Sequence, residues 1–414
     1  MNVYGKKDGE FFKPKLILFI NTVVLLLAFL GLTFINSGYA IPKGKDSLLG
    51  RRDKPFAVHF VDKDCGWIVG DFGLAFKTRD GGESWQRVNM DSSYSLKDVT
   101  FIDKHGWIVG EEGLILHTTD GGNNWSIQKS ESDTFLVRVF FLDKSKGFIV
   151  GAYGTVLRTD DGGSSWKTVS LDWLELLPET FIENGIFTLN LFDIFFIDKS
   201  NGWIVGDFGS VLYTSDGGDS WEMLRVGSFP HHFSVYFKNN LEGFVTGQNG
   251  LFLKTKDGGR KWEKVSLGTT RGLFNMDFRG NYGAIVGLAG CLFISNDGGE
   301  TWNPVRLKMR APFPWLSDVA IIPSETSGEL IYVGKGTIRK INILDHVPSA
   351  TAVIGHDERV ISPTSIGHDE RVISPTTQQK TGTTGIIGHD ERVISPTSIG
   401  HDERVISPTT QQKK

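Results

Sequence analysis

The residues whose type and spacing could do chemistry are six aspartates that recur in one motif. Each lies in Thr/Ser-x-Asp-Gly-Gly-x-x-Trp, hereafter the Asp box, and successive boxes are 40, 41, 55, 41 and 40 residues apart. The aspartates are Asp80, Asp120, Asp161, Asp216, Asp257 and Asp297. A carboxylate can act as a general acid or base. In a turn it can instead accept hydrogen bonds from the backbone N–H groups ahead of it, and the two glycines permit a positive φ. We favour this structural interpretation, because turn chemistry explains the recurring residues.

The elements that must position these boxes are short β-strands. Within residues 98–129, polar and apolar residues alternate over 98–101, β-forming residues fill 107–109 and 114–118, and a fourth strand begins at Trp125. A period near 40 residues with four antiparallel strands per unit is typical of propeller blades. The tryptophan of each box is then expected to bury its ring where neighbouring blades meet.

A second motif, Gly-Trp/Phe-Ile-Val-Gly, gives an independent count of the blades. It begins at Gly66, Gly106, Gly147, Gly202, Gly243 and, in a weaker form, Gly283. A degenerate seventh copy, residues 330–334, has no Asp box after it. The sequence therefore predicts an all-β fold, a seven-bladed β-propeller over residues 55–346, whose closure hides the sheet edges. The alternative is a six-bladed ring with a C-terminal cap.

The start of the chain predicts export. Residues 1–15 contain four lysines, and residues 16–35 form an apolar run long enough to span a bilayer as a helix. The lysines predict a cytoplasmic N-terminus and a propeller on the other side of the membrane. Small residues before Ala40 offer a signal-peptidase site. Residues 16–35 are thus a transmembrane anchor, which their length favours, or a cleaved signal peptide. The protein is predicted to be membrane-anchored or secreted, with its propeller in the periplasm.

Residues 347–414 differ in composition from the rest of the chain. The sequence Ile-Gly-His-Asp-Glu-Arg-Val-Ile-Ser-Pro-Thr occurs four times, starting at Ile354, Ile366, Ile387 and Ile399. No copy has enough apolar residues for a core, so we predict a disordered, low-complexity tail. The tail could act as a multivalent motif. Metal binding by the histidines of the tail is less favoured. Each repeat unit holds one histidine, so a flexible chain would have to lose its conformational entropy to bring several of them to one metal ion.

Composition argues against several classes of function. A net charge of −4 and a pI near 6.2 give no basic field for nucleic acid. The sequence has no Cys/His metal spacing, no phosphate loop and no Ser-His-Asp arrangement. Cys65 and Cys291 fall in blades one and six, which are not neighbours, so we expect no disulfide. We predict no cofactor, no metal site and no catalytic residue.

Candidate binding residues lie on the face formed by the second-to-third turns and by the links between blades. The nearly uniform Asp boxes occupy the opposite face, and binding residues usually lie on variable loops over a rigid scaffold. The second-to-third turns present Phe72, Tyr153 and Phe208, beside the acidic Asp71 and Asp207. Each aromatic side chain could contact a partner or pack into its own blade.

The 55-residue step indicates an insertion, residues 171–190, between blades three and four. It is apolar and acidic, contains Trp173, Leu174 and Leu177, and predicts a short helix that ends near Pro178. An exposed apolar segment often marks a partner site. The alternative is that the insertion folds over its own blades.

The first strands also predict a ring of side chains around the central channel. The equivalent positions are Ala57, Asp98, Arg138, Asp193, Ser234, Asn275 and Asp318. A ring of mixed charge could bind something small, or it could only hydrate the channel.

The repeat Asp-Val-x-Phe-x-Asp-x-x-x-Gly-Trp-x-Val-Gly-x-x-Gly, followed by the Asp box, resembles the photosystem II stability/assembly factor family over residues 55–346. The resemblance implies a lumenal seven-bladed propeller that is non-enzymatic, binds a reaction-centre protein precursor and helps to assemble the complex. In a photosynthetic organism it implies the thylakoid lumen. The family's arginine-rich binding patch makes Arg138 and Arg158 in blade three candidate partner contacts.

The rival class is a sialidase-like glycosidase acting on extracytoplasmic glycans, because such enzymes also carry Asp boxes on propellers. They need three arginines that clamp a carboxylate, a Tyr/Glu pair and an acid. This chain lacks the Arg-Ile-Pro signature that those enzymes place before the first box. We therefore predict a non-enzymatic, exported propeller that binds a membrane or exported protein client and assists the assembly or stability of a membrane protein complex.

Overall fold

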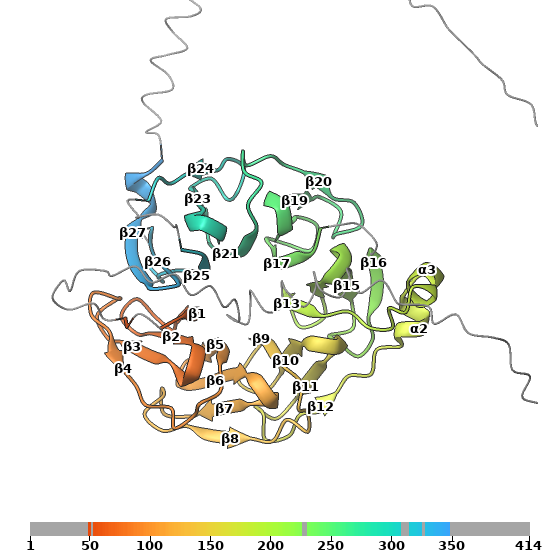
Figure 1. The fold of residues 1–414 in the computed structure, drawn as a ribbon, viewed down its shortest axis with the longest axis horizontal. Helices are drawn as coiled ribbons and strands as arrows, with labels where there is room; N and C mark the ends of the chain where they lie inside the picture. The colour runs from red at the N-terminus through yellow and green to blue at the C-terminus, as the bar shows by residue number, and fades with distance from the viewer. Residues whose placement is uncertain (1–48, 51–52, 226–229, 308–313, 325–327, 348–414) are drawn as a thin grey trace, which may run out of the picture. The chain divides into compact units, whose positions relative to one another are not determined.

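The computed structural model of the chain describes residues 49–50, 53–225, 230–307, 314–324 and 328–347. In this part of the chain, seven antiparallel sheets surround a central channel (Figure 1). The strands of each sheet neighbour one another in chain order, so every blade is a meander. The prediction of seven blades is confirmed. The six-bladed alternative is wrong, because residues 316–342 form a sheet of their own.

Each blade starts with an inner strand beside the channel and runs outward to the rim. The inner strands are β1 (Pro55–Phe60), β5 (Leu96–Ile102), β9 (Leu136–Phe141), β13 (Leu191–Phe196), β17 (His232–Phe237), β21 (Leu273–Arg279) and β25 (Leu316–Ile321). The second strands are β2 (Gly66–Gly70), β6 (His105–Gly110), β10 (Gly147–Gly151), β14 (Gly202–Gly206), β18 (Gly243–Gly247), β22 (Tyr282–Gly287) and β26 (Glu329–Gly334). The third strands are β3 (Ala75–Thr78), β7 (Ile115–Thr118), β11 (Val156–Thr159), β15 (Val211–Thr214), β19 (Phe252–Thr255), β23 (Leu292–Ser295) and β27 (Thr337–Asn342). The outer strands are β4 (Gln86–Arg87), β8 (Ser126–Gln128), β12 (Lys167–Thr168), β16 (Glu222–Arg225), β20 (Glu263–Lys264) and β24 (Asn303–Pro304).

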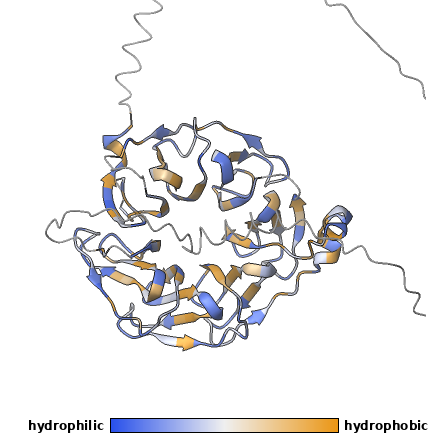
Figure 2. Ribbon diagram, in the orientation of Figure 1, coloured by the Kyte–Doolittle hydropathy of each residue, from blue (hydrophilic) through white to orange (hydrophobic). Residues whose placement is uncertain are grey.

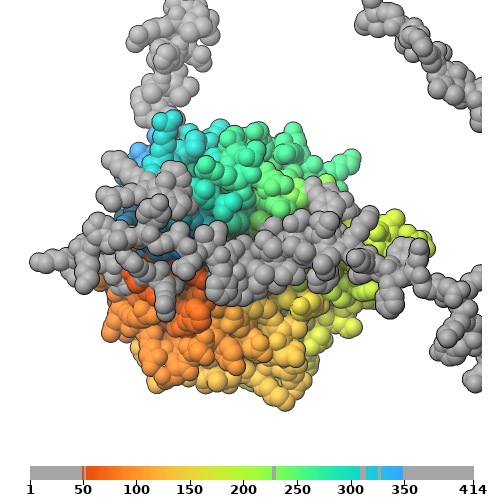
Figure 3. All heavy atoms as spheres, in the orientation of Figure 1, coloured from red at the N-terminus to blue at the C-terminus, as the bar shows by residue number. Residues whose placement is uncertain are grey.

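Short 3-10 turns join the second and third strands of the first six blades. They are η1 (Asp71–Gly73), η2 (Glu111–Gly113), η3 (Ala152–Gly154), η4 (Asp207–Gly209), η5 (Gln248–Gly250) and η6 (Leu288–Gly290), and η7 (Ile343–Asp345) follows β27. We call the face that carries η1–η6 and the links between blades the linker face, and the opposite one the Asp-box face. The insertion contains two short helices, α2 (Trp173–Leu176) and α3 (Glu179–Glu183), at the edge of the propeller (Figure 1). In the space-filling view, the yellow-green atoms of this segment project from that edge (Figure 3).

The hydrophobic core is divided into seven seams between neighbouring blades. One cluster of buried side chains joins blades six and seven, the next joins seven and one, and so on around the ring. The second strands β2, β10, β14 and β18 are buried along their whole length, and β6, β22 and β26 are buried except for their first residue, since a second strand is covered by another blade on each side. Apolar residues accordingly dominate the inner and second strands, whereas outer strands such as β4, β12 and β20 are polar (Figure 2). This explains why Gly-Trp-Ile-Val-Gly is a continuous apolar run.

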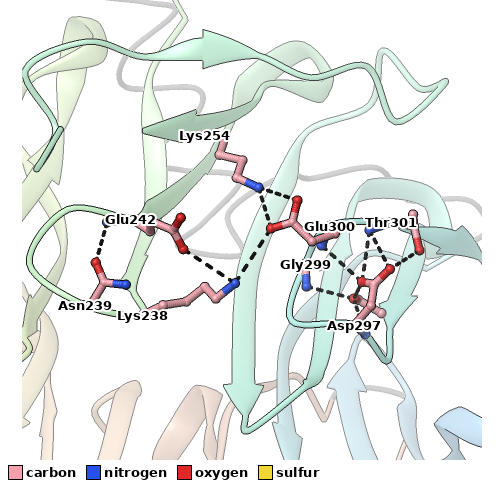
Figure 4. Close-up of polar contacts among 9 residues, drawn as sticks. Lys238, Asn239, Glu242, Lys254, Asp297, Gly299, Glu300 and Thr301 are labelled. Carbon is pink, nitrogen blue, oxygen red and sulfur yellow. Dashed lines mark hydrogen bonds and ion pairs between the residues drawn. The ribbon is translucent and has the colours of Figure 1, made fainter. Parts of the chain in front are cut away.

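The Asp boxes close tight turns, as predicted. In the sixth box, Oδ1 of Asp297 accepts hydrogen bonds from the N–H groups of Glu300 and Thr301, both at 3.0 Å (Figure 4). The hydroxyl of Ser295 donates to Asp297 at 2.7 Å and accepts the N–H of Gly299 at 2.9 Å. The other boxes repeat this arrangement. Hydrogen bonds to the carboxylate lower the pKa of Asp80 in the first box to about 2, and the bond from the Ser84 side chain has the largest effect.

The box tryptophans lie in the seams between blades, as expected. The ring of Trp125 stands edge-on to that of Trp67, 5.5 Å away between blades one and two. Basic side chains of the third strands reach the box of the next blade. Lys254 of β19, for example, lies 2.7 Å from Glu300 of the sixth box (Figure 4). Lys340 of β27 makes the same contact with Glu83 of the first box at 2.7 Å, which joins the last blade to the first.

The predicted ends of the chain lie outside the described residues, namely the span 16–35 and, beyond Val347, the repeat tail. Among the residues that the structure does describe, no helix combines the length and the apolar character needed to cross a membrane. Cys65 and Cys291 are both free and half-buried.

Candidate functional site

A β-bulge interrupts every inner strand at the same position. In each inner strand, one unpaired residue separates the first two residues that pair with the second strand. The two partners on the second strand are adjacent in the sequence. One extra residue per blade therefore interrupts the regular alternation of side chains between the two faces of the sheet. The seven bulged residues are Phe56, Lys97, Val137, Phe192, Phe233, Phe274 and Ser317. Bulges re-aim side chains and are frequent beside functional sites.

The bulged residues line a cavity of about 400 Å³ in the channel, which we call the cup. Gln248 and Asn249 of η5 and Leu288 of η6 also line it, so the cup opens on the linker face. Its walls are aromatic. Phe233 stands edge-on between Phe192 at 5.7 Å and Phe274 at 5.8 Å, and on the other side Phe56 stacks on Trp315 at 6.0 Å.

Two cations lie at the wall of the cup. The ammonium of Lys97 is 4.3 Å from the centre of the Phe56 ring, and burial lowers the pKa of Lys97 to about 8. Arg271, in the link before blade six, is exposed and reaches the carbonyl of Ala289 at 3.4 Å. The mouth of the cup thus combines aromatic surface with positive charge.

Arg138 lies deeper in the channel, between two carboxylates. Its Nε is 3.0 Å from Oδ1 of Asp193, and its Nη1 is 3.5 Å from Oδ1 of Asp98. Burial opposes the charge on Arg138, but the nearby carboxylates outweigh it and raise the pKa of the guanidinium. Burial also raises the pKa values of Asp98 and Asp193, against the opposing effect of Arg138. A buried charge that keeps partners of opposite sign is the arrangement that limits its desolvation cost.

The channel carboxylates also join blades to one another. Asp98 accepts the N–H of Val139 at 2.9 Å, and Asp193 accepts the N–H of Val235 at 2.9 Å. Asp318 of the last blade accepts the N–H of Val58 in the first blade at 2.7 Å.

The predicted ring of channel residues is therefore a hydrogen-bonded network that forms the floor of the cup. On its other side, Asp193 accepts the hydroxyl of Ser234 at 2.9 Å, and Asn275 donates from its amide to Asp318. Burial raises the pKa of Asp318 to about 7. An aromatic wall above a satisfied polar floor suits an apolar or amphipathic group, such as a side chain of an extended peptide. In the described part of the chain, no three His, Cys, Asp or Glu side chains are grouped so as to hold a metal ion.

The second-to-third turns place their central residue in the left-handed region. Phe72 and Tyr153 have φ of 53° and 55°, which is unusual for bulky residues, and both side chains are 71% exposed. Leu174 at the start of the insertion is also exposed. These three predicted contacts lie at the surface, but none of them lines the cup.

Phe208 and Leu177 were candidate partner contacts, and the structure instead buries both. The ring of Phe181 in α3 stands edge-on to Phe208 at 5.4 Å, and Leu177 and Leu189 complete a small cluster on blade four. Trp173 is half-buried over the turn at Gly154, where an added Cβ would lie 2.5 Å from its indole nitrogen. The insertion thus folds over its own blades, because its apolar side chains need cover.

The helix prediction for the insertion was correct in part. Asp172 caps α2 by accepting the N–H groups of Leu174 and Glu175, and α2 ends before Pro178. A second helix, α3, then begins after that proline.

Arg158 does not join Arg138 in the channel. Its guanidinium pairs with Asp160 and with Asp219 of the fourth Asp box, on the Asp-box face. The acidic turn residues Asp71 and Asp207 are also buried. Asp71 lies 3.0 Å from Lys54, and Asp207 accepts the backbone and side-chain N–H groups of Asn190, so both hold the links between blades.

Sequence reasoning identified the polar floor of the cup and missed its aromatic walls. The signal was present, since each bulged residue directly precedes a ring residue that the repeat alignment had already identified. Phenylalanine occupies that place in blades one, four, five and six. Regular alternation along a strand predicts that such a residue points into a seam, so without the bulge no cavity wall is expected there.

The family model of photosynthesis system II assembly factor YCF48 matches residues 48–132, 182–272 and 231–331, more than half of the chain. None of the curated proteins compared with the chain matches it. Among solved structures, a YCF48 bound to a D1 peptide is similar with 22% identity and a TM-score of 0.56, covering 72% of this chain and 94% of its own. YCF48 from Cyanidioschyzon merolae has 21% identity and a TM-score of 0.59, covering 71% and 96%.

An ancestral GH74 enzyme is similar with 15% identity and a TM-score of 0.55, and it covers 69% of this chain but 44% of its own. At these identities the structures show a shared propeller fold and nothing finer. The family is shown by the sequence match over the repeats, and the resemblance noted in the sequence is confirmed. The chain belongs to the family of photosynthesis system II assembly factor YCF48.

Proposed function

We propose that this protein is a non-enzymatic, exported propeller that binds an extended segment of a membrane-protein client in the cup and assists the assembly or stability of a membrane complex. The observation that carries this proposal is the row of seven bulges, which turns four phenylalanines and Lys97 toward one cavity on the linker face. Interfaces derive most of their affinity from a few buried aromatic anchors and the pockets they fill.

The related structure of a YCF48 bound to a D1 peptide supports a peptide as the ligand. A cavity of about 400 Å³ has room for one or two side chains rather than a folded domain. The cations at its wall favour a segment that carries negative charge beside an apolar side chain. Export and tethering by residues 16–35 would place the cup on the side of the membrane where such a segment is exposed.

The glycosidase alternative requires carboxylates that face a substrate. Asp98, Asp193 and Asp318 each accept a backbone N–H from another blade, which commits them to the scaffold. The lining of the cup contains two arginines, Arg138 and Arg271, and the first of these is already paired. This arrangement favours binding over glycan hydrolysis.

The test is binding of a fluorescent D1 peptide to the full chain and to matched variants. Phe192→Ala removes a half-buried cup residue, whereas Phe72→Ala removes an exposed aromatic residue outside the cup. We expect the cup variant to lose at least about tenfold in affinity, the scale of an interface hot spot. We expect Phe72→Ala to bind like the wild type.

Equal losses in the two variants would place binding outside the cup. If neither variant nor wild type binds the peptide, crosslinking in the native membrane fraction follows, comparing wild type with Phe192→Ala. Turnover of a fluorogenic sialoside or a β-glucan by the wild type, lost on mutation of Asp193, would support the enzyme instead.

A further inference from the structure

Within the described part of the chain, the lining of the cup contains one primary amine, that of Lys97 in β5. We propose that Lys97 is a nucleophile that forms an imine with an apolar aldehyde held in the cup. The reaction goes beyond the binding of a client segment and does not depend on which client the protein binds.

The bulge of β5 brings Lys97 to the cup. Leu96 and Asp98, on either side of Lys97, pair with Gly110 and Val109 of β6, and Lys97 itself stays outside this ladder. The residue lines the cavity and is 7% exposed. Lys97 is therefore shielded from bulk solvent but borders the cavity, where a small ligand can reach it.

Aromatic rings from both neighbouring blades lie beside the amine. Its nitrogen is 4.3 Å from the centre of the Phe56 ring in blade one and 5.8 Å from that of Phe135, in the link before blade three. A lysine in an apolar pocket loses part of the hydration of its ammonium. This desolvation is one of the ways in which a lysine becomes a nucleophile toward carbonyl groups.

The charged groups near the amine do not cancel the effect of burial. Burial lowers the pKa of Lys97 to about 8, although the carboxylates of Asp71, Glu111 and Asp98 act in the opposite direction. Asp71 is itself paired with Lys54 at 3.0 Å. A pKa of about 8 leaves about a quarter of the amines neutral at pH 7.5, against about 0.1% for a lysine of ordinary pKa.

In the proposed reaction, the neutral amine nitrogen attacks the carbonyl carbon of the aldehyde, and a proton moves from nitrogen to the carbonyl oxygen. The carbinolamine then loses water, so one amine and one aldehyde yield one imine and one water, with no oxidant or reductant. Phe192, Phe233 and Phe274 offer an apolar wall for the chain of the aldehyde. The volume of about 400 Å³ lies in the range of small-molecule sites.

The first experiment traps the imine in the full chain at pH 7.5. Hexanal is added with sodium cyanoborohydride, which reduces an imine to a stable secondary amine, and the modified lysines are identified by peptide mass mapping. We expect Lys97 to react at least about ten times faster than Lys129, whose side chain is 84% exposed. The rate at Lys97 should also saturate with hexanal concentration, because the aldehyde binds in the cup before it reacts.

Lys77 is the matched control within the same chain. Burial lowers its pKa too, and its ammonium lies 5.0 Å from the centre of the Trp67 ring, but it does not line the cup. If a desolvated amine beside an aromatic ring were sufficient, Lys77 would react as fast as Lys97. We expect Lys77 to react no faster than the exposed lysines.

The second experiment uses variants that separate the amine from the wall. Lys97→Arg keeps the positive charge but removes the reactive amine, so the fast site should be lost. Phe192→Ala should raise the hexanal concentration at half-saturation several-fold. The same variant should leave the reaction of Lys97 with formaldehyde unchanged, because formaldehyde has no chain to contact the wall, and this comparison also shows that the variant is folded.

Competitive labelling with trace acetic anhydride gives an independent check of the amine. The reactivity of Lys97 should reach half of its maximum near pH 8, whereas ordinary lysines do so near pH 10.4. Equal rates of hexanal modification at Lys97 and Lys129, equal enrichment at Lys77, or hexanal saturation that Phe192→Ala does not alter would each overturn the proposal.

Discussion

Replacing Gly122 with alanine should destabilise the propeller far more than the same change at Gly121, its neighbour in the second Asp box. Both residues have a positive φ, 79° and 73°, so each alanine costs about 1–2 kcal/mol of backbone strain. A Cβ at Gly122 would also lie 2.1 Å from Cζ2 of Trp67, whereas a Cβ at Gly121 would have no atom within 4 Å. Trp67 is fully buried, stacked on Phe101 and edge-on to Trp125, so its ring has no room to retreat.

Overpacking of a core costs about 1–3 kcal/mol, so the two variants should differ by roughly this amount in the free energy of unfolding. Urea unfolding followed by tryptophan fluorescence measures the difference. The melting temperatures should separate by about 2–4 °C per kcal/mol. Gly259→Ala, at the equivalent place in the fifth box, is a graded control, since its Cβ would lie 3.3 Å from the ring of Trp262. Its loss should fall between the other two. Equal losses at Gly121 and Gly122 would refute the argument that the indole sets the requirement for glycine.

Three further predictions concern the channel, the insertion and the closing seam. Burial raises the pKa of Asp318 to about 7 from an ordinary value of 3.8, so its contribution to stability is fully present below about pH 4 and is lost as the pH rises through 7. The stability of the wild type relative to Asp318→Asn, measured by urea unfolding, should therefore decrease from pH 4 to pH 8, and a constant difference would contradict this assignment. Phe181→Ala uncovers Phe208, so hydrogen exchange in residues 171–190 should accelerate while the global melting temperature changes little; unchanged exchange would show that other contacts hold the insertion. A double-mutant cycle of Lys340→Ala and Glu83→Ala should give a coupling of at most about 1 kcal/mol, because Glu83 is largely exposed, and a much larger coupling would mean that this ion pair dominates ring closure.

The scaffold could be predicted from the sequence because its determinants are local. An Asp box needs an aspartate, a hydroxyl and two glycines within a few residues, and the aspartate and the hydroxyl make their hydrogen bonds inside the same turn. The second strands are equally local, since a continuous apolar run identifies a strand buried on both sides. The same reasoning counted the seventh blade, which has no box, from the degenerate copy of the second strand at residues 330–334 and the strand before it at residues 318–321.

The surface could not be predicted in this way, because it depends on contacts between distant segments. Phe72 and Phe208 occupy identical Gly-Asp-Phe-Gly turns, yet the first side chain is 71% exposed and the second 6%. The difference is the insertion, which places Phe181 over one of the two turns. Arg138 and Arg158 are likewise in one blade, yet the first lies in the channel and the second reaches the Asp-box face, because one is on an inner strand and the other on a third strand.

The bulges of the inner strands have a consequence for how the binding preference of this propeller can change. A bulged side chain lies outside the apolar clusters of the two adjoining seams, so exchanging it alters the wall of the cup while those clusters keep their own side chains. Each of the seven blades therefore offers one position at the wall of the cup whose substitution leaves the residues of the seam clusters unchanged. Related propellers that descend from one ancestor could therefore acquire new clients by single substitutions at these seven positions, while the strands and seams of the blades stay the same.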